Sequence, residues 1–194
     1  MNRLRPLIAI ICASLLLPAC KGMGNGSNTD SMTKTDSMNA VRDTTQIAVP
    51  LTKEDIQFTI NIASSGLKEI ELGKLAQKKA ENKRVRNFGG LMAKDITKTL
   101  NKLKIIAQNR HITLPATPLP ADQKTIDSLN QLSGKAFDNA YVNLMITDRE
   151  NYVTIFEGVA KNSIDPDIKS FANKTLTPIK NHLDAITTIS ESMK

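Results

Sequence analysis

The chain has 194 residues, a formal net charge of +7 at pH 7 and only 4% aromatic residues. The positive charge alone would suit nucleic acid, but no aromatic stacking platform or recognised nucleic-acid-binding motif accompanies it, so we expect no nucleic-acid partner. The sequence contains two histidines, and no Ser or Cys nucleophile can be matched to a nearby base. Hydrolase chemistry is therefore unsupported, and we expect a protein that is not an enzyme.

Residues 1–19 have the features of a secretory signal peptide. Two arginines precede a charge-free apolar run over residues 7–17, which is shorter than the roughly 20 residues needed to cross a bilayer. The run ends in LPAC at residues 17–20, and this motif resembles the lipobox of bacterial lipoproteins. The resemblance implies cleavage before Cys20 and lipidation of its sulfur and new amino group. The alternative is an ordinary cleaved signal that leaves Cys20 as a free thiol.

Residues 20–50 are predicted to be the lipidated cysteine followed by a flexible tether. The segment is rich in Gly, Ser, Thr, Asn and Asp, and such a composition buries too little apolar surface to offset the entropy of ordering. A flexible linker of this length spans about 30 Å on average, which suits a spacer between a membrane and a folded domain. Since Cys12 leaves with the signal peptide, we expect no disulfide, and the fold must rest on its hydrophobic core.

Residues 51–194 have the length of one domain and carry 21 Lys and Arg against 16 Asp and Glu, a net charge of +5. Apolar residues recur at helical spacing in four long stretches. We expect these helices to begin after Thr52, Asn82, Ser133 and Asp165, which are residue types favoured at helix N-caps. Pro166 after the last cap is typical of a first helical turn.

The lengths of the connections predict how the helices pack. Short connections near Glu81 and Asn162 indicate two antiparallel hairpins. A longer, proline-containing segment over 109–133 joins them, and apolar residues over 126–132 predict a short extra helix within it. Two hairpins with one long crossover have the connectivity of ferritin-like bundles. The predicted fold is all-α, a ferritin-like four-helix bundle with one long crossover between two helical hairpins.

Four polar residues fall near the middle of the long helices, on or beside their apolar stripes. Asp95, Asp148 and His182 lie within the stripes, and Glu71, four residues after Leu67, lies at the edge of the first. Packing of the stripes would bring three carboxylates and an imidazole toward one level of the core. Burying carboxylates is costly unless they are paired or bound to metal, so this cluster requires a physical explanation.

Two explanations of the cluster are open. The first is a structural polar layer in which His182 or Arg149 supplies the partner of the carboxylates. The second is a reduced carboxylate and histidine site for iron, manganese or zinc, formed by Glu71, Asp95, Asp148 and His182. The Glu-x-x-His motifs of di-metal bundles are absent, so we favour the structural layer and expect no cofactor.

Two further features of the helices have alternative interpretations. Lys94, Lys98 and Lys102 form an i, i+4 ladder on the second long helix; we favour a solvated face over contact with an anionic surface. Pro178 lies inside the fourth long helix, where proline removes a backbone hydrogen bond, so a kink near His182 is expected.

Four stretches of the predicted domain resemble a known family: GLKEIELGKLAQKKAENKRVRNFGGLMAKD, HITLPA, LSGKAFDNAYVNLMITDRENYVTIFEGVAKNSIDPDIKSFANKTL and IKNHL. They are similar to the bacterial envelope family known as domain of unknown function 4142, and the similarity covers residues 51–193. The resemblance implies a four-helix ferritin-like fold, export and often an outer-membrane lipoprotein. It brings no established activity.

The same resemblance bears on metal binding. Members of the family commonly carry Asp-His in the second and third long helices and a His in the fourth. This chain has Asp95-Ile96 and Asp148-Arg149, while His182 is kept. Two imidazole ligands that the resemblance implies are therefore missing, which argues against a metal site.

These observations lead to two expectations for function. The favoured one is a bacterial envelope lipoprotein, anchored through Cys20 to the outer membrane, whose bundle lies in the periplasm or at the surface and has a structural or interaction role. Anionic lipid or cell-wall polymer would be its neighbour, through weak, salt-sensitive contacts. The alternative is a ferritin-like metal-binding or redox protein.

Overall fold

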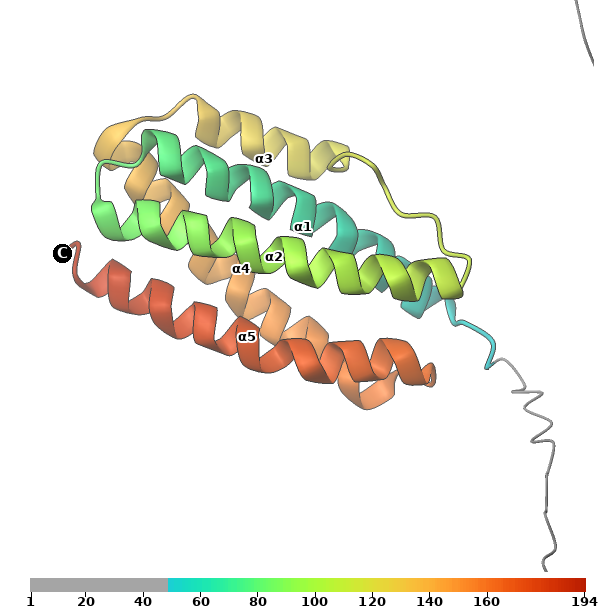
Figure 1. Cartoon of the computed structure of the whole chain (residues 1–194). Coiled ribbons are helices and arrows are strands. Elements are labelled where there is room, and N and C mark those ends of the chain that lie inside the picture. The colour runs from blue at the N-terminus through green and yellow to red at the C-terminus, as the bar shows by residue number, and fades with distance from the viewer. Residues whose placement is uncertain (1–48) are drawn as a thin grey trace, which may run out of the picture. The chain divides into compact units, whose positions relative to one another are not determined.

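The computed structural model describes residues 49–194, and within this range the chain forms five α-helices and no β-strand (Figure 1). The helices are α1 (Lys53–Lys79), α2 (Lys83–Asn109), α3 (Pro120–Asn130), α4 (Gly134–Asn162) and α5 (Pro166–Glu191). The predicted signal peptide, Cys20 and nearly all of the predicted tether lie outside the described residues.

Hydrogen bonds at the N-caps explain where the long helices begin. The side-chain oxygens of Thr52 and Asn82 each accept a bond from a backbone N–H of the following turn, at 3.0 and 2.8 Å. Asp165 accepts two such bonds, at 3.0 and 2.9 Å. Ser133 occupies the N-cap of α4 without a side-chain bond. All four predicted helix starts are confirmed. At three of them the cap side chain satisfies backbone donors that a helix end leaves free.

The helices form two antiparallel hairpins, α1 with α2 and α4 with α5 (Figure 1). The crossover after α2 returns along the bundle and contains α3, which packs on α1 and touches α4. As a result α2 and α4 run in the same direction (Figure 1). This is the predicted four-helix bundle with one long crossover. Among the helices of residues 49–194, none combines the length and apolar character required to span a bilayer.

Glycines allow α1 and α2 to approach backbone to backbone. A Cβ added to Gly73 would lie 2.5 Å from the carbonyl oxygen of Gly89, and a Cβ added to Gly89 would lie 2.6 Å from the Cβ of Ala76. Both distances are far shorter than a van der Waals contact. The closest part of this hairpin therefore requires glycine on both helices.

The core consists of two apolar clusters at opposite ends of the bundle. The first lies toward the α1–α2 turn and includes Leu72, Phe88, Met92, Phe137, Tyr141, Met145 and Ile186. The second lies toward the crossover end of α2 and includes Phe58, Ile62, Leu103, Phe156, Phe171 and Ile179. Between these clusters, Glu69 on α1, Arg149 on α4 and His182 on α5 bring polar side chains into the interior.

Candidate functional site

A polar layer crosses the bundle between the two apolar clusters. Its members are Glu69 on α1, Asp95 on α2, Arg149 on α4 and His182 on α5, so each long helix contributes one polar side chain. Glu69, Arg149 and His182 are buried, whereas Asp95 is half-buried. Each of the four residues lies near the middle of its helix.

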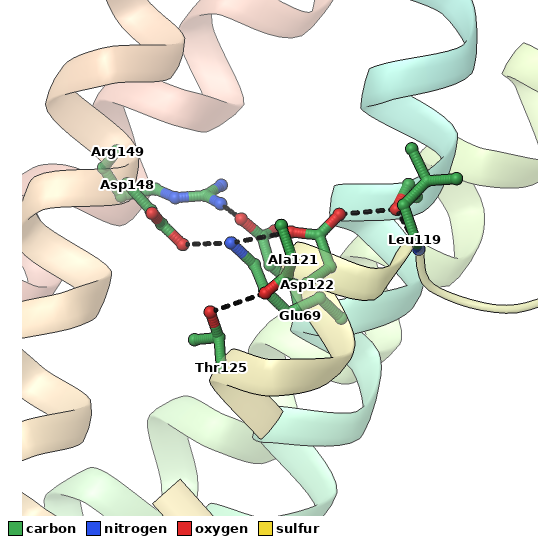
Figure 2. A network of polar contacts seen from close by, with 9 residues as sticks. Glu69, Leu119, Ala121, Asp122, Thr125, Asp148 and Arg149 are labelled. Atoms are coloured by element: carbon green, nitrogen blue, oxygen red, sulfur yellow. Dashed lines mark hydrogen bonds and ion pairs between the residues drawn. The ribbon is translucent and has the colours of Figure 1, made fainter. Parts of the chain in front are cut away.

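The most deeply buried part of the layer is the ion pair between Glu69 and Arg149, in which a terminal guanidinium nitrogen donates to the carboxylate (Figure 2). Their side chains are 2% and 1% exposed. The guanidinium carbon of Arg149 also lies 4.7 Å from the ring centroid of Tyr152, a cation–π contact. Burial lowers the pKa of Arg149 to about 10, so the guanidinium remains charged at neutral pH.

A second network surrounds Lys68, beside the polar layer. The Lys68 Nζ lies 3.0 Å from Asp148 Oδ2 on α4 and 3.4 Å from Asp122 Oδ1 on α3 (Figure 2). Asp122 also accepts a hydrogen bond from the hydroxyl of Ser64, whose oxygen in turn accepts one from the backbone N–H of Leu119 at 2.8 Å. These contacts tie the start of α3 to α1 and α4, and so hold the crossover on the bundle.

His182 connects α5 to α2. Its Nε2 lies 3.4 Å from Asp95 Oδ2, and Lys98 Nζ lies 3.0 Å from the other carboxylate oxygen. Burial, and then the nearby charge of Arg149, lower the pKa of His182 despite the opposing effect of Asp95. Burial alone would raise the pKa of Asp95, but the hydrogen bonds of Lys98 and His182 outweigh this effect and lower it. The imidazole is therefore neutral and the carboxylate ionised at neutral pH.

A small cavity of about 40 Å³ adjoins Glu69, Arg149 and Tyr152, and apolar side chains such as Ile96 and Ile179 also line it. Pockets for small organic ligands measure ~300–1,000 Å³. The interior beside the charged residues thus has room for water-sized molecules and not for an organic substrate.

The structure brings together two of the four predicted site residues. Asp95 and His182 are in contact, as the stripes predicted. Asp148 does not join them, because it pairs with Lys68 toward α3; its neighbour Arg149 points into the core. The prediction for Glu71 was wrong: its side chain is 49% exposed and pairs with Lys74 at 2.7 Å.

The error at Glu71 has a geometric cause. The predicted apolar stripe of α1 passed through Leu67, which is only half-buried. Because successive residues turn by about 100°, a shift of two positions from Glu69 carries a side chain to the opposite face. Glu69 was missed, and the available signal was its place between Gly66 and Gly73, which mark the side of α1 that approaches α2.

The donor set of the polar layer does not fit a metal site. Within residues 49–194, no three His, Cys, Asp or Glu side chains are grouped so that they could hold a metal ion. Arg149 is paired with Glu69, and Lys68 lies between Asp122 and Asp148. The carboxylates of Glu69, Asp122 and Asp148 are thus neutralised by Arg149 and Lys68 of the same chain.

Comparison with known proteins adds the family and the fold. The family described as "Domain of unknown function (DUF4142)" matches residues 40–189. No curated protein matches the sequence. The crystal structure of a DUF305 fragment from Deinococcus radiodurans is similar with a TM-score of 0.60 at 11% identity, over 73% of this chain and 97% of that chain; at this identity the likeness concerns the fold alone. Since the family match spans most of the sequence, the chain belongs to the DUF4142 family.

Proposed function

We propose that this protein is a lipoprotein of the bacterial envelope, anchored by lipid on Cys20, whose helical bundle has a structural or interaction role and no enzymatic one. The observation that carries the proposal is the LPAC motif at residues 17–20, directly after an apolar run of signal-peptide length. The lipobox resemblance extends to sorting: in some bacteria a residue other than Asp after the cysteine, here Lys21, favours release to the outer membrane, and we place the bundle in the periplasm or at the surface.

The polar layer supports the structural part of the proposal. Glu69 and Arg149 pair with each other in the core, and Lys68 connects three helices through its ion pairs with Asp122 and Asp148. Their arrangement accounts for their burial without a substrate or cofactor, because paired charges offset the cost of leaving water. The cavity beside Arg149 is also too small for an organic substrate.

Incorporation of a labelled fatty acid tests the anchor. The wild-type chain should take up the label, and Cys20→Ala should not, because the modified sulfur is absent. Cys12→Ala is the matched control and should be labelled like wild type, since this cysteine leaves with the signal peptide. Label that persists in Cys20→Ala, or never appears in the wild type, would contradict the proposal.

Metal analysis of the purified protein tests the role of the bundle. We expect no stoichiometric iron, manganese or zinc, and no change in melting temperature after dialysis against these ions. A stoichiometric metal that is lost in His182→Ala or Asp95→Ala would overturn the structural role and favour the metal-binding alternative. Glu71→Ala serves as the control, because its side chain is exposed.

A further inference from the structure

The positive charge of the described residues is concentrated on one helix. α2 contains seven Lys and Arg and a single acidic residue, Asp95. The other four helices together contain 12 Lys and Arg against 13 Asp and Glu. The excess charge of the bundle therefore belongs to α2 and not to its surface as a whole.

This charge lies on an outward face of α2 that also exposes large apolar side chains. The face, called here the α2 face, consists of exposed residues at helical spacing: Arg84, Asn87, Leu91, Lys94, Lys98, Lys102 and Ile105. Leu91 and Ile105 are 44% and 59% exposed. α2 packs mainly against α1 and α5, which leaves this face open to solvent (Figure 1). Asp95 borders the face: one of its carboxylate oxygens contacts His182 and the other pairs with Lys98 at 3.0 Å. Lys94 and Lys102 have no acidic partner among the described residues, so they supply the free charge of the face.

A groove between α2 and α5 extends the α2 face. Its volume is about 350 Å³; Lys102 and Lys174 are among its polar lining residues, and Ile106 and Phe171 among its apolar ones. Its carboxylate, Asp167, pairs with Arg110 at 3.2 Å, so the lysines keep their attraction for anions. A surface of this kind is complementary to a phospholipid: its cationic groups match the phosphate of the head group, and its apolar side chains match the acyl chains.

We propose that the α2 face docks on the surface of an anionic phospholipid bilayer. The lysines attract anionic head groups, and Leu91 and Ile105 enter the interfacial region, as on basic amphipathic helices that lie on membranes. Neither contribution is strong alone, but a tether of about 30 Å keeps the domain at high effective concentration near the lipid. This proposal rests on the proposed function, which supplies the lipid-anchored tether. It also replaces our expectation that Lys94, Lys98 and Lys102 form only a solvated face.

Because the sequence contains no tryptophan, a single introduced tryptophan can serve as a fluorescent probe of docking. Leu91→Trp places the chain's one indole on the α2 face. Ile155→Trp is the matched control, because Ile155 is also 44% exposed but lies on α4, diagonally across the bundle from α2. Each full-length variant is purified in detergent and reconstituted into vesicles of brominated phosphatidylcholine, alone or mixed with phosphatidylglycerol. Circular dichroism verifies that each variant is folded.

The bromine atoms quench an indole that enters the bilayer. We expect strong quenching of Leu91→Trp in the anionic vesicles, weak quenching in phosphatidylcholine alone, and none at Ile155→Trp in either. Each lysine near an anionic leaflet contributes about fivefold in partitioning, so adding Lys94→Gln and Lys102→Gln should reduce docking roughly 25-fold. Adding Lys124→Gln and Lys161→Gln instead removes the same charge from α3 and α4 and should leave the quenching unchanged.

Equal quenching at the two probe positions, or quenching that ignores phosphatidylglycerol or the α2 lysines, would overturn the proposal. High salt should also abolish the difference between the two lipid mixtures, because it screens the head-group charge. The fatty-acid label separates the two proposals. If the wild-type chain takes up no fatty-acid label but Leu91→Trp is still quenched selectively, only the lipid anchor is rejected. If the label is incorporated normally but the quenching is not selective for Leu91→Trp, only docking through the α2 face is rejected.

Discussion

Arg149 is the largest fully buried side chain in the described part of the chain. Moving its charge out of water is costly, and the cost is offset only where the partner is close and well placed. Glu69 and the ring of Tyr152 provide these contacts. The stability of the bundle should therefore depend strongly on keeping both members of this pair.

Arg149→Met should lower the free energy of unfolding by about 3–5 kcal/mol, because Glu69 is left buried without a partner. Urea denaturation followed by circular dichroism measures the change. The double variant Glu69→Leu/Arg149→Met should regain most of the loss, since it removes the unpaired charge together with the pair.

The surface pair Lys180–Glu157 provides the control for this experiment. The Lys180 Nζ and Glu157 Oε1 are 2.8 Å apart, but both side chains are 52% exposed. Lys180→Met should therefore change the free energy of unfolding by less than about 1 kcal/mol. A loss at Arg149 as small as the loss at Lys180 would contradict the burial argument.

His182 should make the stability of the bundle depend on pH. Its pKa is lowered in the folded state, so the unfolded chain binds a proton more readily. The free energy of unfolding should be highest above about pH 6.5, the unfolded pKa, and fall as the pH decreases toward the folded pKa of His182. Arg149 on α4 opposes the protonated imidazole, whereas Asp95 on α2 favours it.

Denaturant titrations between pH 7 and pH 5 measure this dependence. His182→Gln should flatten the profile over that range, because glutamine does not titrate. His111 is the one other histidine of the chain and is exposed, so His111→Gln should keep the wild-type profile. A profile that is unchanged in His182→Gln would assign the pH dependence to other groups.

The α1–α2 hairpin is the element whose geometry is most sensitive to side-chain size. Gly73 faces the backbone of Gly89, which cannot move aside as a flexible side chain would. In contrast, a Cβ added to Gly158 on α4 would meet no atom within 4 Å. The same substitution should thus have opposite effects at two helical glycines.

Gly73→Ala should destabilise the protein by about 1–3 kcal/mol, because α1 and α2 must separate to admit the methyl group. Gly158→Ala should stabilise it by about 0.5–1 kcal/mol, since alanine loses less conformational freedom in a helix. Thermal or urea unfolding measures both changes. Gain of stability in both variants would show that the hairpin is packed less closely at Gly73 than described.

For the molecule as a whole, local signals predicted the architecture well. The cap residues Thr52, Asn82 and Asp165 act within one helical turn of their own position, so sequence alone shows where helices begin. The lengths of the connections then predicted the two hairpins and the crossover. The contact of Asp95 with His182 followed from the apolar stripes of α2 and α5.

The interior charges could not be predicted equally well, because they depend on the rotation of α1 and on contacts between distant segments. Glycine and alanine, rather than large apolar residues, mark the side of α1 that faces α2, and this shifted the predicted carboxylate from Glu69 to Glu71. The link from Lys68 to Asp122 depends on where the crossover places α3. Nothing local to either residue specifies that position.

The polar layer between the two apolar clusters has a consequence for how the hairpins align along the bundle axis. Contacts between apolar side chains are non-directional, so α1–α2 could slide past α4–α5 by one turn, about 5.4 Å, and still bury hydrocarbon. The same slide would separate Arg149 from Glu69 and His182 from Asp95, and would leave buried charges without their partners. The polar layer therefore permits a single axial alignment of the α1–α2 and α4–α5 hairpins.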